Sequence, residues 1–165
     1  MKINVFFHTA AEDEKALTRL AKKAVTLALG SLARKKGEVN IIYVDGGGIK
    51  DINRRFLGKD RLTDTIAFNY PQNAPRSGEE LPFGDVYVCV PQAFSQARDY
   101  GKDGLAELLT VTAHGALHLA GMDDKTKAQR DEMNGLAESI TEKIYPRGGK
   151  PAARRPYGRH AKRRG

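Results

Sequence analysis

Two histidines and a nearby carboxylate are the residues of this chain best suited to chemistry. His114 and His118 are four positions apart, so on an α-helix their side chains share one face, about one turn from each other. Gly121 allows the backbone to turn back through a left-handed conformation, which would bring Asp124 toward the two imidazoles. Three protein ligands and one open position are typical of a catalytic metal site, whereas structural zinc usually has four protein ligands.

The order His-x3-His-x2-Gly-x2-Asp invites comparison with the metzincin zinc proteases, which carry His-Glu-x-x-His-x-x-Gly-x-x-His. In those proteases the glutamate after the first histidine activates the water that attacks the peptide. Gly115 occupies this position here, so the sequence disfavours peptide hydrolysis. Two histidines that merely pack in a core are the alternative. The helix-ending glycine and the well-placed carboxylate make that alternative the weaker one.

The length and composition predict one domain with a substantial core. The chain has 165 residues, of which 40% are hydrophobic and 29% charged, as in ordinary globular proteins. No apolar run approaches the roughly 20 residues of a membrane span, and the N-terminal stretch lacks the features of a secretory signal. The single cysteine, Cys89, leaves no internal disulfide. We expect it to be a buried residue of a cytoplasmic protein.

The net charge of +8 comes entirely from the last residues of the chain. Residues 147–165 contain eight basic side chains and no acidic one, together with prolines and glycines. This composition predicts a domain over 1–146 and a disordered basic tail over 147–165. Such tails bind nucleic-acid phosphates or simply increase solubility, and we favour nucleic acid.

Hydrophobic periodicity predicts the elements that must position the histidines. Strands are expected at 2–8, 38–45, 63–70 and 85–90, and helices at 12–32, 49–57, 91–100, 104–120 and 127–145. The glycines at 46–48 are interpreted as a flexible turn, and 71–82 as an irregular loop. Leu27 and Leu136 are assigned to the apolar stripes of their helices. The fold class is therefore α/β (α+β): one small domain with an approximately four-stranded mixed sheet, four to five helices and a central metal-bearing helix.

Several motifs in one order make the chain resemble the YbeY family of endoribonucleases and ribosomal RNA maturation factors. The matching segments are Ile52-Asn53, Gly58-Lys59-Asp60, 63–68, Gly84-Asp85-Val86, Gln96-Ala97 and 114–124. The chain departs from the family pattern at two positions. Asp124 stands where the family usually has a third histidine ligand, and two histidines with one carboxylate remain a sound zinc set. The alternative ligand is Asp123. Leu57 replaces a common arginine, and Arg54 or Arg55 could supply a guanidinium instead.

The resemblance implies a metal-dependent endoribonuclease that acts on single-stranded RNA in ribosomal RNA processing and ribosome quality control. His114, His118 and Asp124 are expected to hold one divalent ion, zinc being the expected one, which would activate water and polarise the phosphate. Arg54, Arg55 and Lys59 are expected to hold phosphates. No general base is evident, with Asp64 and Asp123 as weak candidates. Ribosomal RNA and small-subunit proteins are the expected partners, without a nucleotide cofactor or a membrane.

Two other functions remain open at this point. The first is a metal-dependent hydrolase of another substrate, against which the missing glutamate at Gly115 weighs only for peptides. The second is a non-catalytic RNA-binding factor for ribosome assembly, in which the metal is structural. Leu57 lends weight to the second function, because leucine cannot contact a phosphate as arginine does.

Overall fold

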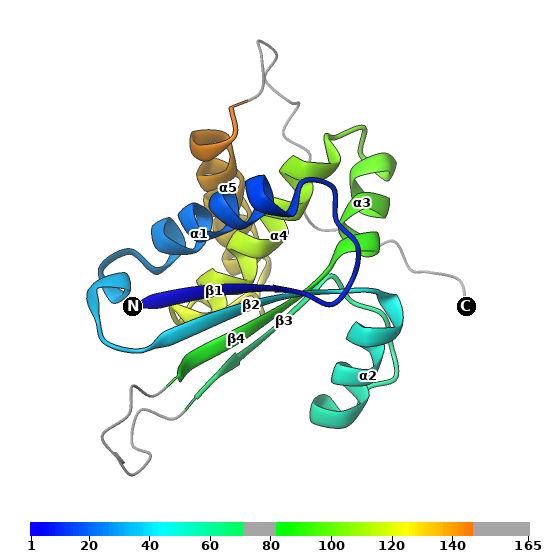
Figure 1. Cartoon of the computed structure of the whole chain (residues 1–165), viewed down its shortest axis with the longest axis horizontal. Coiled ribbons are helices and arrows are strands. Elements are labelled where there is room, and N and C mark those ends of the chain that lie inside the picture. Colours follow the sequence, from blue (N-terminus) through cyan, green and yellow to red (C-terminus); the bar gives the residue numbers. More distant parts are fainter. Residues whose placement is uncertain (71–81, 147–165) are drawn as a thin grey trace.

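The computed structural model describes residues 1–70 and 82–146, which form one mixed sheet and its covering helices (Figure 1). The strands lie in the order β1-β2-β4-β3; β1, β2 and β4 are parallel, and β3 is antiparallel to β4. This arrangement confirms the predicted four-stranded mixed sheet. The strands are β1 (Lys2–Phe7), β2 (Glu38–Val44), β3 (Thr65–Asn69) and β4 (Pro82–Cys89). The helices are α1 (Glu14–Leu29), the 3-10 helix η1 (Gly30–Arg34), α2 (Gly46–Leu57), α3 (Val90–Asp99), α4 (Gly104–Leu119) and α5 (Lys127–Ile144).

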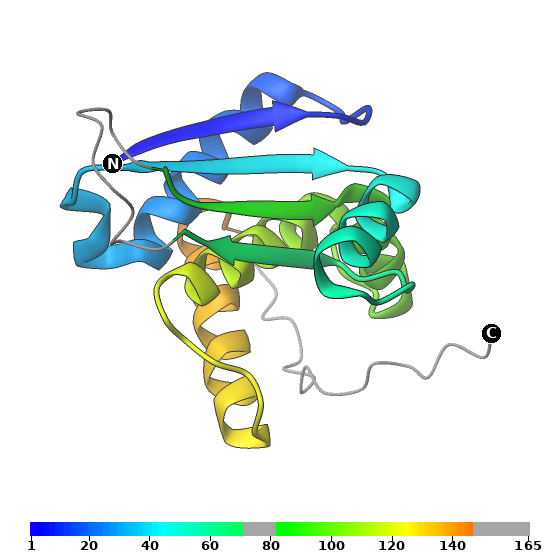
Figure 2. The same ribbon diagram turned by 90° about the horizontal axis from the view of Figure 1, so that it is seen from below.

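The two faces of the sheet carry separate apolar clusters, because alternate strand residues point to opposite faces. Ile41 and Tyr43 of β2 belong to the large cluster shared with α1, α4 and α5. Ile42 and Val44 of the same strand belong to a smaller cluster that includes Ile49 of α2. Figures 1 and 2 show this division: α2 lies on one side of the sheet, and α1, α4 and α5 lie on the other.

Helix α4 is the central element of the larger layer. It contacts α1, α3 and α5 as well as strands β3 and β4, and twelve of its sixteen residues are buried. A helix surrounded in this way has little freedom to shift, so it can hold side chains in fixed positions. This confirms the prediction of a central histidine-bearing helix. In the described part of the chain, no helix, α4 included, is both long and apolar enough to cross a membrane.

The prediction of a flexible turn at residues 46–48 is wrong, because these glycines form the first turn of α2. Asp45 caps the helix: its Oδ1 accepts a hydrogen bond from the backbone N–H of Gly48 at 2.7 Å. Ile49, in the next position, is completely buried. The cap and the burial of Ile49 together offset the conformational entropy that glycine loses in a helix.

Two leucines assigned to apolar stripes are exposed, so these assignments are wrong. Leu27 of α1 is 40% exposed and Leu136 of α5 is 42% exposed. Each helix buries only part of its circumference, and these leucines lie at the margin of the buried stripe. Met133 and Ile140 of α5 are buried as predicted, and Cys89 is buried in β4.

Most element boundaries agree with the prediction within about two residues, a usual margin for helix ends. Three boundaries differ by three residues: α1 ends at Leu29 and is followed by η1, α2 begins at Gly46, and β4 begins at Pro82. Residues 71–81 of the predicted loop at 71–82 lie outside the described residues. Pro82 is the first residue of β4 and not the last of the loop. The predicted disordered tail at 147–165 also lies outside the described residues.

Candidate metal centre

His114, His118 and Asp124 converge although they come from two different segments. Both histidines lie in the second half of α4, and Asp124 lies in the connection between α4 and α5. Asp124 Oδ2 is 3.5 Å from Nε2 of His114 and 3.4 Å from Nε2 of His118. One potential ligand atom from each residue lies within 4.8 Å of the others. The structure therefore brings together the three residues predicted as ligands.

The backbone reversal that carries Asp124 back to the histidines is a Schellman motif. Gly121 has a φ of 96°, in the region that favours glycine. Its N–H donates to the carbonyl of His118 at 3.0 Å, and the N–H of Met122 donates to the carbonyl of Leu117 at 3.1 Å. These two bonds define the motif, and they confirm the turn predicted at Gly121.

The orientation of His118 suits metal binding through its outer nitrogen. Nδ1 of His118 lies 3.2 Å from the carbonyl oxygen of Met122. A carbonyl only accepts, so Nδ1 carries the proton and donates it to this bond. The lone pair then resides on Nε2, the atom that faces Asp124. A backbone carbonyl that orients a histidine in this way is common around protein metal sites.

The surroundings of His114 favour its neutral form. Burial lowers the pKa of His114 below its ordinary value, and the neighbouring His118 lowers it further. The carboxylates of Asp64 and Asp124 act in the opposite direction. A metal requires the neutral imidazole, so the lowered pKa removes a proton that would compete with the ion.

Arg130 of α5 holds the segment that contains Asp124. Its Nη1 donates to the carbonyl oxygen of Lys125 at 2.9 Å and to that of Asp124 at 3.3 Å. Sequence reasoning missed this residue. Arg130 lies in the first turns of α5, where a positive charge interacts unfavourably with the helix dipole. This unfavourable position is the one feature of the sequence that could have indicated a special role for Arg130.

Asp123 is turned away from the two histidines. Its Oδ1 accepts a hydrogen bond from the backbone N–H of Asp124 at 2.9 Å, and its Oδ2 lies 3.5 Å from Nζ of Lys125. In the described part of the chain, the convergent group contains Asp124 and not Asp123. The geometry therefore favours Asp124 of the two carboxylates considered from the sequence.

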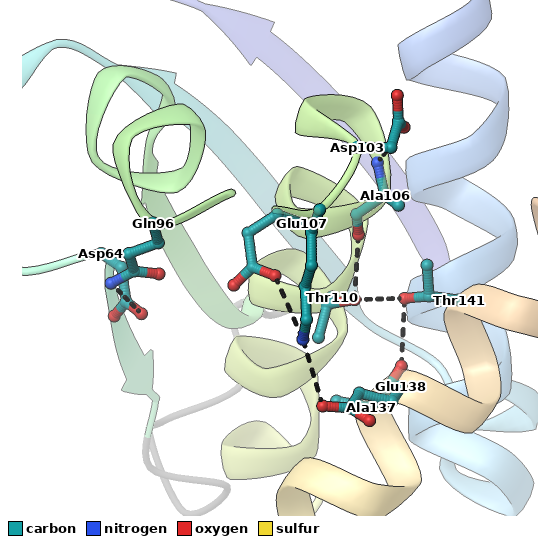
Figure 3. A network of polar contacts seen from close by, with 10 residues as sticks. Asp64, Gln96, Asp103, Ala106, Glu107, Thr110, Ala137, Glu138 and Thr141 are labelled. Carbon is teal, nitrogen blue, oxygen red and sulfur yellow. Dashed lines mark hydrogen bonds and ion pairs between the residues drawn. The ribbon is translucent and has the colours of Figure 1, made fainter. Parts of the chain in front are cut away.

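Asp64 approaches the site from the start of β3. Its backbone carbonyl accepts from the N–H of Cys89 at 2.8 Å, and its Oδ2 accepts from Nε2 of Gln96 at 3.3 Å (Figure 3). The negative charge of Asp64 acts to raise the pKa of His114, so its carboxylate lies near that ring. Gln96 was noted in the sequence only as part of a motif. Its contact with Asp64 joins α3 to the residue before β3, far away in the sequence.

Gly115 faces the sheet and not the converging ligands. A β-carbon at this position would overlap Cγ1 of Val86 and lie 2.9 Å from Oγ1 of Thr65. A glutamate could therefore not occupy this position without displacing the helix from the sheet. The close packing of Gly115 against the sheet therefore explains why no protease-like glutamate follows the first histidine.

A buried ionic and hydroxyl network braces the first half of α4 (Figure 3). Lys102 Nζ lies 3.9 Å from Glu107 Oε2 and 3.5 Å from Glu138 Oε1, so it links α4 with α5. The hydroxyls of Thr110 and Thr141 join the same two helices at 2.9 Å. The network keeps α4 in one register against α5, and with it the two histidines.

The structure does not bring Arg54, Arg55 and Lys59 together with the three converging residues. Arg54 and Arg55 belong to α2, which packs on the sheet face opposite α4, and Lys59 follows that helix (Figure 2). Both arginines form exposed ion pairs with Asp51, at 2.8 and 3.4 Å. Their contact with phosphates remains a prediction.

The donor set fits a transition-metal ion. Two imidazole nitrogens and one carboxylate oxygen are ligands that zinc accepts, and imidazole is disfavoured by magnesium and calcium. The ligand atoms are only partly exposed, so an ion between them would keep access to solvent on one side. Access of this kind leaves room for a water molecule or a substrate oxygen.

Comparison with known proteins gives a consistent result. Residues 4–145 match the family model described as endoribonuclease YbeY. A protein of Elusimicrobium minutum described as endoribonuclease YbeY is 49% identical over 144 residues, which cover 87% of this chain and 100% of that protein. The protein of the same description from Desulforamulus reducens is 34% identical, over 79% of this chain and 88% of that one. A solution structure from Thermotoga maritima has a TM-score of 0.59 at 26% identity, covering 87% of this chain and 89% of that chain.

Proposed function

Because the chain belongs to the YbeY family of endoribonucleases, we propose that it cuts single-stranded RNA at a metal centre formed by His114, His118 and Asp124. The convergence of one potential ligand atom from each residue within 4.8 Å carries this proposal. The position of Asp124 gives it further support, because the carboxylate reaches both imidazoles although it lies beyond the end of their helix.

Zinc is the ion we propose for this centre. An ion bound by these three residues supplies Lewis acidity, which activates water and stabilises negative charge on a phosphate. The protein contributes orientation: the carbonyl of Met122 holds the His118 ring, and Arg130 holds the backbone beside Asp124. A rigid arrangement of this kind reduces the reorganisation needed when charge develops on the phosphate.

Asp64 is the residue we assign to proton transfer in the reaction. Hydrolysis of a phosphodiester requires a group that accepts a proton from the attacking water. The carboxylate of Asp64 lies near enough to His114 to act on its pKa and is held by Gln96, whereas that of Asp123 is turned toward Lys125. Asp64 directly precedes β3 and does not belong to the histidine helix, so the proposed base comes from outside α4.

Ribosomal RNA is the substrate that we propose, with a role in maturation of the small-subunit RNA and in ribosome quality control. Ribosomal RNA and proteins of the small subunit would then be the partners, and the cytoplasm the compartment. The family description supports the RNA substrate, and the basic composition of residues 147–165 supports an additional contact with phosphates.

A cleavage assay on single-stranded RNA tests the proposed activity. The zinc-loaded protein should cut the RNA, and His114→Ala should abolish both zinc binding and cleavage. His8→Ala is the matched control, because His8 is an exposed histidine remote from α4 in the sequence. Loss of cleavage in the control as well would mean that the variants act through something other than the metal.

The same assay separates the two alternative functions. RNA binding without any cleavage, in the parent protein and in His114→Ala alike, would indicate an assembly factor with a structural metal. Zinc-dependent hydrolysis of small phosphodiesters but not of RNA would indicate a hydrolase of another substrate. Double-stranded RNA of the same sequence, left uncut, would establish the preference for single strands.

A further inference from the structure

Phe56, near the end of α2, is the most exposed of the large hydrophobic side chains in the described residues, at 64%. Leu57 beside it is also exposed, and both lie on the helix that packs against the sheet face opposite α4. Burial of apolar surface is favourable, and adjoining exposed apolar side chains such as these are a feature of interaction sites.

The Phe56 ring is held by aromatic neighbours. It meets Phe68 of β3 edge to face at 5.5 Å, and Phe68 meets Tyr87 of β4 in the same manner at 6.0 Å. Edge-to-face contacts of this kind are favourable and directional. Because Phe68 and Tyr87 belong to the sheet, they give the exposed ring a firm base. We call Phe56, Phe68 and Tyr87 the aromatic row.

The surroundings of the aromatic row are basic. Residues 46–62 contain five lysines or arginines and two aspartates. Arg54 and Arg55 share one partner, Asp51, so the pair of guanidinium groups keeps an excess positive charge. Exposed ion pairs contribute little to stability, so both arginines can exchange Asp51 for another anion at little cost.

The position of β3 relates the aromatic row to the metal centre. β3 is an edge strand, and its residues alternate between the two sheet faces. Thr65 faces Gly115 of α4, next to His114, whereas Ile66 and Phe68 face α2. A strand of RNA that passes around this edge could reach the metal ligands on one face and Phe56 on the other.

We propose that Phe56 is a stacking site for a base of the RNA substrate, with Arg54 and Arg55 contacting the adjoining phosphates. This inference rests on the proposed function and adds a second contact with the same substrate. Aromatic rings beside basic residues are the usual means of holding single-stranded nucleic acid without sequence preference. The excess positive charge favours a polyanion over an apolar or basic protein surface as the occupant.

Binding of a labelled single-stranded RNA of about twelve nucleotides to the full-length protein, without metal so that no cleavage occurs, tests the proposal. Phe56→Ala should weaken binding about tenfold, as expected for the loss of one stacked base, and Phe56→Trp should restore it. Phe6→Ala is the matched control: Phe6 is 46% exposed and lies on β1, at the opposite edge of the sheet. It should bind as the parent protein does.

Charge variants separate the phosphate contacts from stacking. Arg54→Gln with Arg55→Gln should reduce the salt dependence of binding, whereas Phe56→Ala should weaken binding with an unchanged salt slope. Lys22→Gln with Lys23→Gln, which removes the same charge from α1, is the control. A smaller effect of the arginine pair than of this lysine pair would contradict the proposed phosphate contacts.

Zinc-dependent cleavage distinguishes failure of this inference from failure of the proposed function. Phe56→Ala should raise the KM for the long RNA with kcat unchanged, and should leave cleavage of a dinucleotide unaffected. If the parent protein cuts RNA and Phe56→Ala has the same affinity and KM, the proposed stacking site is wrong. The proposed endoribonuclease activity is then unaffected by that result. If the parent protein neither binds nor cuts RNA, the proposed function itself is wrong.

Discussion

Gly115 packs directly against Val86, so closely that a β-carbon on the glycine would overlap Cγ1 of the valine. The contact fixes the distance between α4 and β4 at the level of His114. Replacing Gly115 by alanine must push the helix away from the sheet or displace Val86. Overpacking of this kind typically costs about 1–3 kcal/mol of stability. We expect that loss for Gly115→Ala, measured as the free energy of unfolding in urea, together with weaker zinc binding.

Gly135 of α5 provides the control for this substitution. Apart from its chain neighbours and the nearby backbone of its own helix, no atom lies within 4 Å of a β-carbon added there, so Gly135→Ala should stabilise the protein by about 0.5–1 kcal/mol through its better helix propensity. Val86→Ala should recover part of the stability and zinc affinity lost in Gly115→Ala. An additive effect of the two substitutions would mean that this contact does not set the helix position.

Replacement of Asp124 should weaken zinc binding far more than replacement of Asp123. Asp124→Ala removes one of three ligands, so we expect a loss of zinc affinity of at least about 100-fold. Asp123→Ala should cost much less, because that carboxylate contacts Lys125 and the backbone. Asp124→His should retain zinc. Competition with a chromogenic chelator measures all three affinities, and equal losses for Asp123→Ala and Asp124→Ala would contradict the assignment.

Arg130→Met should weaken zinc binding although the arginine touches none of the proposed ligand atoms. The substitution removes the hydrogen bonds to the carbonyls of Asp124 and Lys125, so the segment that carries the carboxylate becomes less ordered. Loss of an outer contact typically reduces metal affinity about 10- to 100-fold. Lys127→Met, which breaks only an exposed pair with Asp131, should have no such effect. Unchanged zinc affinity in Arg130→Met would contradict this prediction and would mean that the arginine does not help to position Asp124.

The ionic contact between Lys102 and Glu107 should show strong coupling. Glu107 is buried and Lys102 nearly so, and removal of one member of a buried pair typically costs about 3–5 kcal/mol because the other charge is left behind. Lys102→Met and Glu107→Gln should each destabilise the protein, and the double variant should lose less than the sum. A double-mutant cycle on the free energy of unfolding measures the coupling. Additivity would show that the two charges act independently.

Removal of the ion should lower the thermal stability of the parent protein. A ligand that binds only the folded state stabilises it by about 2.7 kcal/mol at a free concentration 100 times its Kd. Adding a chelator to the zinc-loaded protein should therefore reduce Tm by several degrees in a calorimetric scan. His114→Ala should show no change on chelation. A Tm of the parent protein that is insensitive to both zinc and chelator would argue against an ion at this centre.

The order of the elements and the spacing of the candidate ligands were readable from the sequence because both depend on local geometry. Residues four apart share a face on any α-helix, and a glycine three residues after His118 permits the same reversal wherever it occurs. The strands, the helices and the Schellman turn agree with the prediction for this reason. The glycines at 46–48 were misjudged, because the cap from Asp45 and the burial of Ile49 outweighed their propensity.

The contacts around the site could be known only from the tertiary structure. Gln96 of α3 meets Asp64, the residue before β3, and Arg130 meets the segment of Asp124 because α5 folds back along α4. No periodicity in the chain encodes these encounters, since they join residues whose separation depends on how whole layers pack. The exposure of Leu27 and Leu136 has the same origin: the pattern predicts an apolar stripe but not its width.

The sequence by itself determined that two imidazoles and one carboxylate could meet, because four residues of helix and one glycine turn are sufficient to bring them together. Only the tertiary structure decided which aspartate reaches the histidines, why Gly115 must remain a glycine, and that Arg54 and Arg55 lie across the sheet from His114. These features depend on the spacing between layers. Close packing of many distant side chains sets that spacing, and no single segment of the chain contains it.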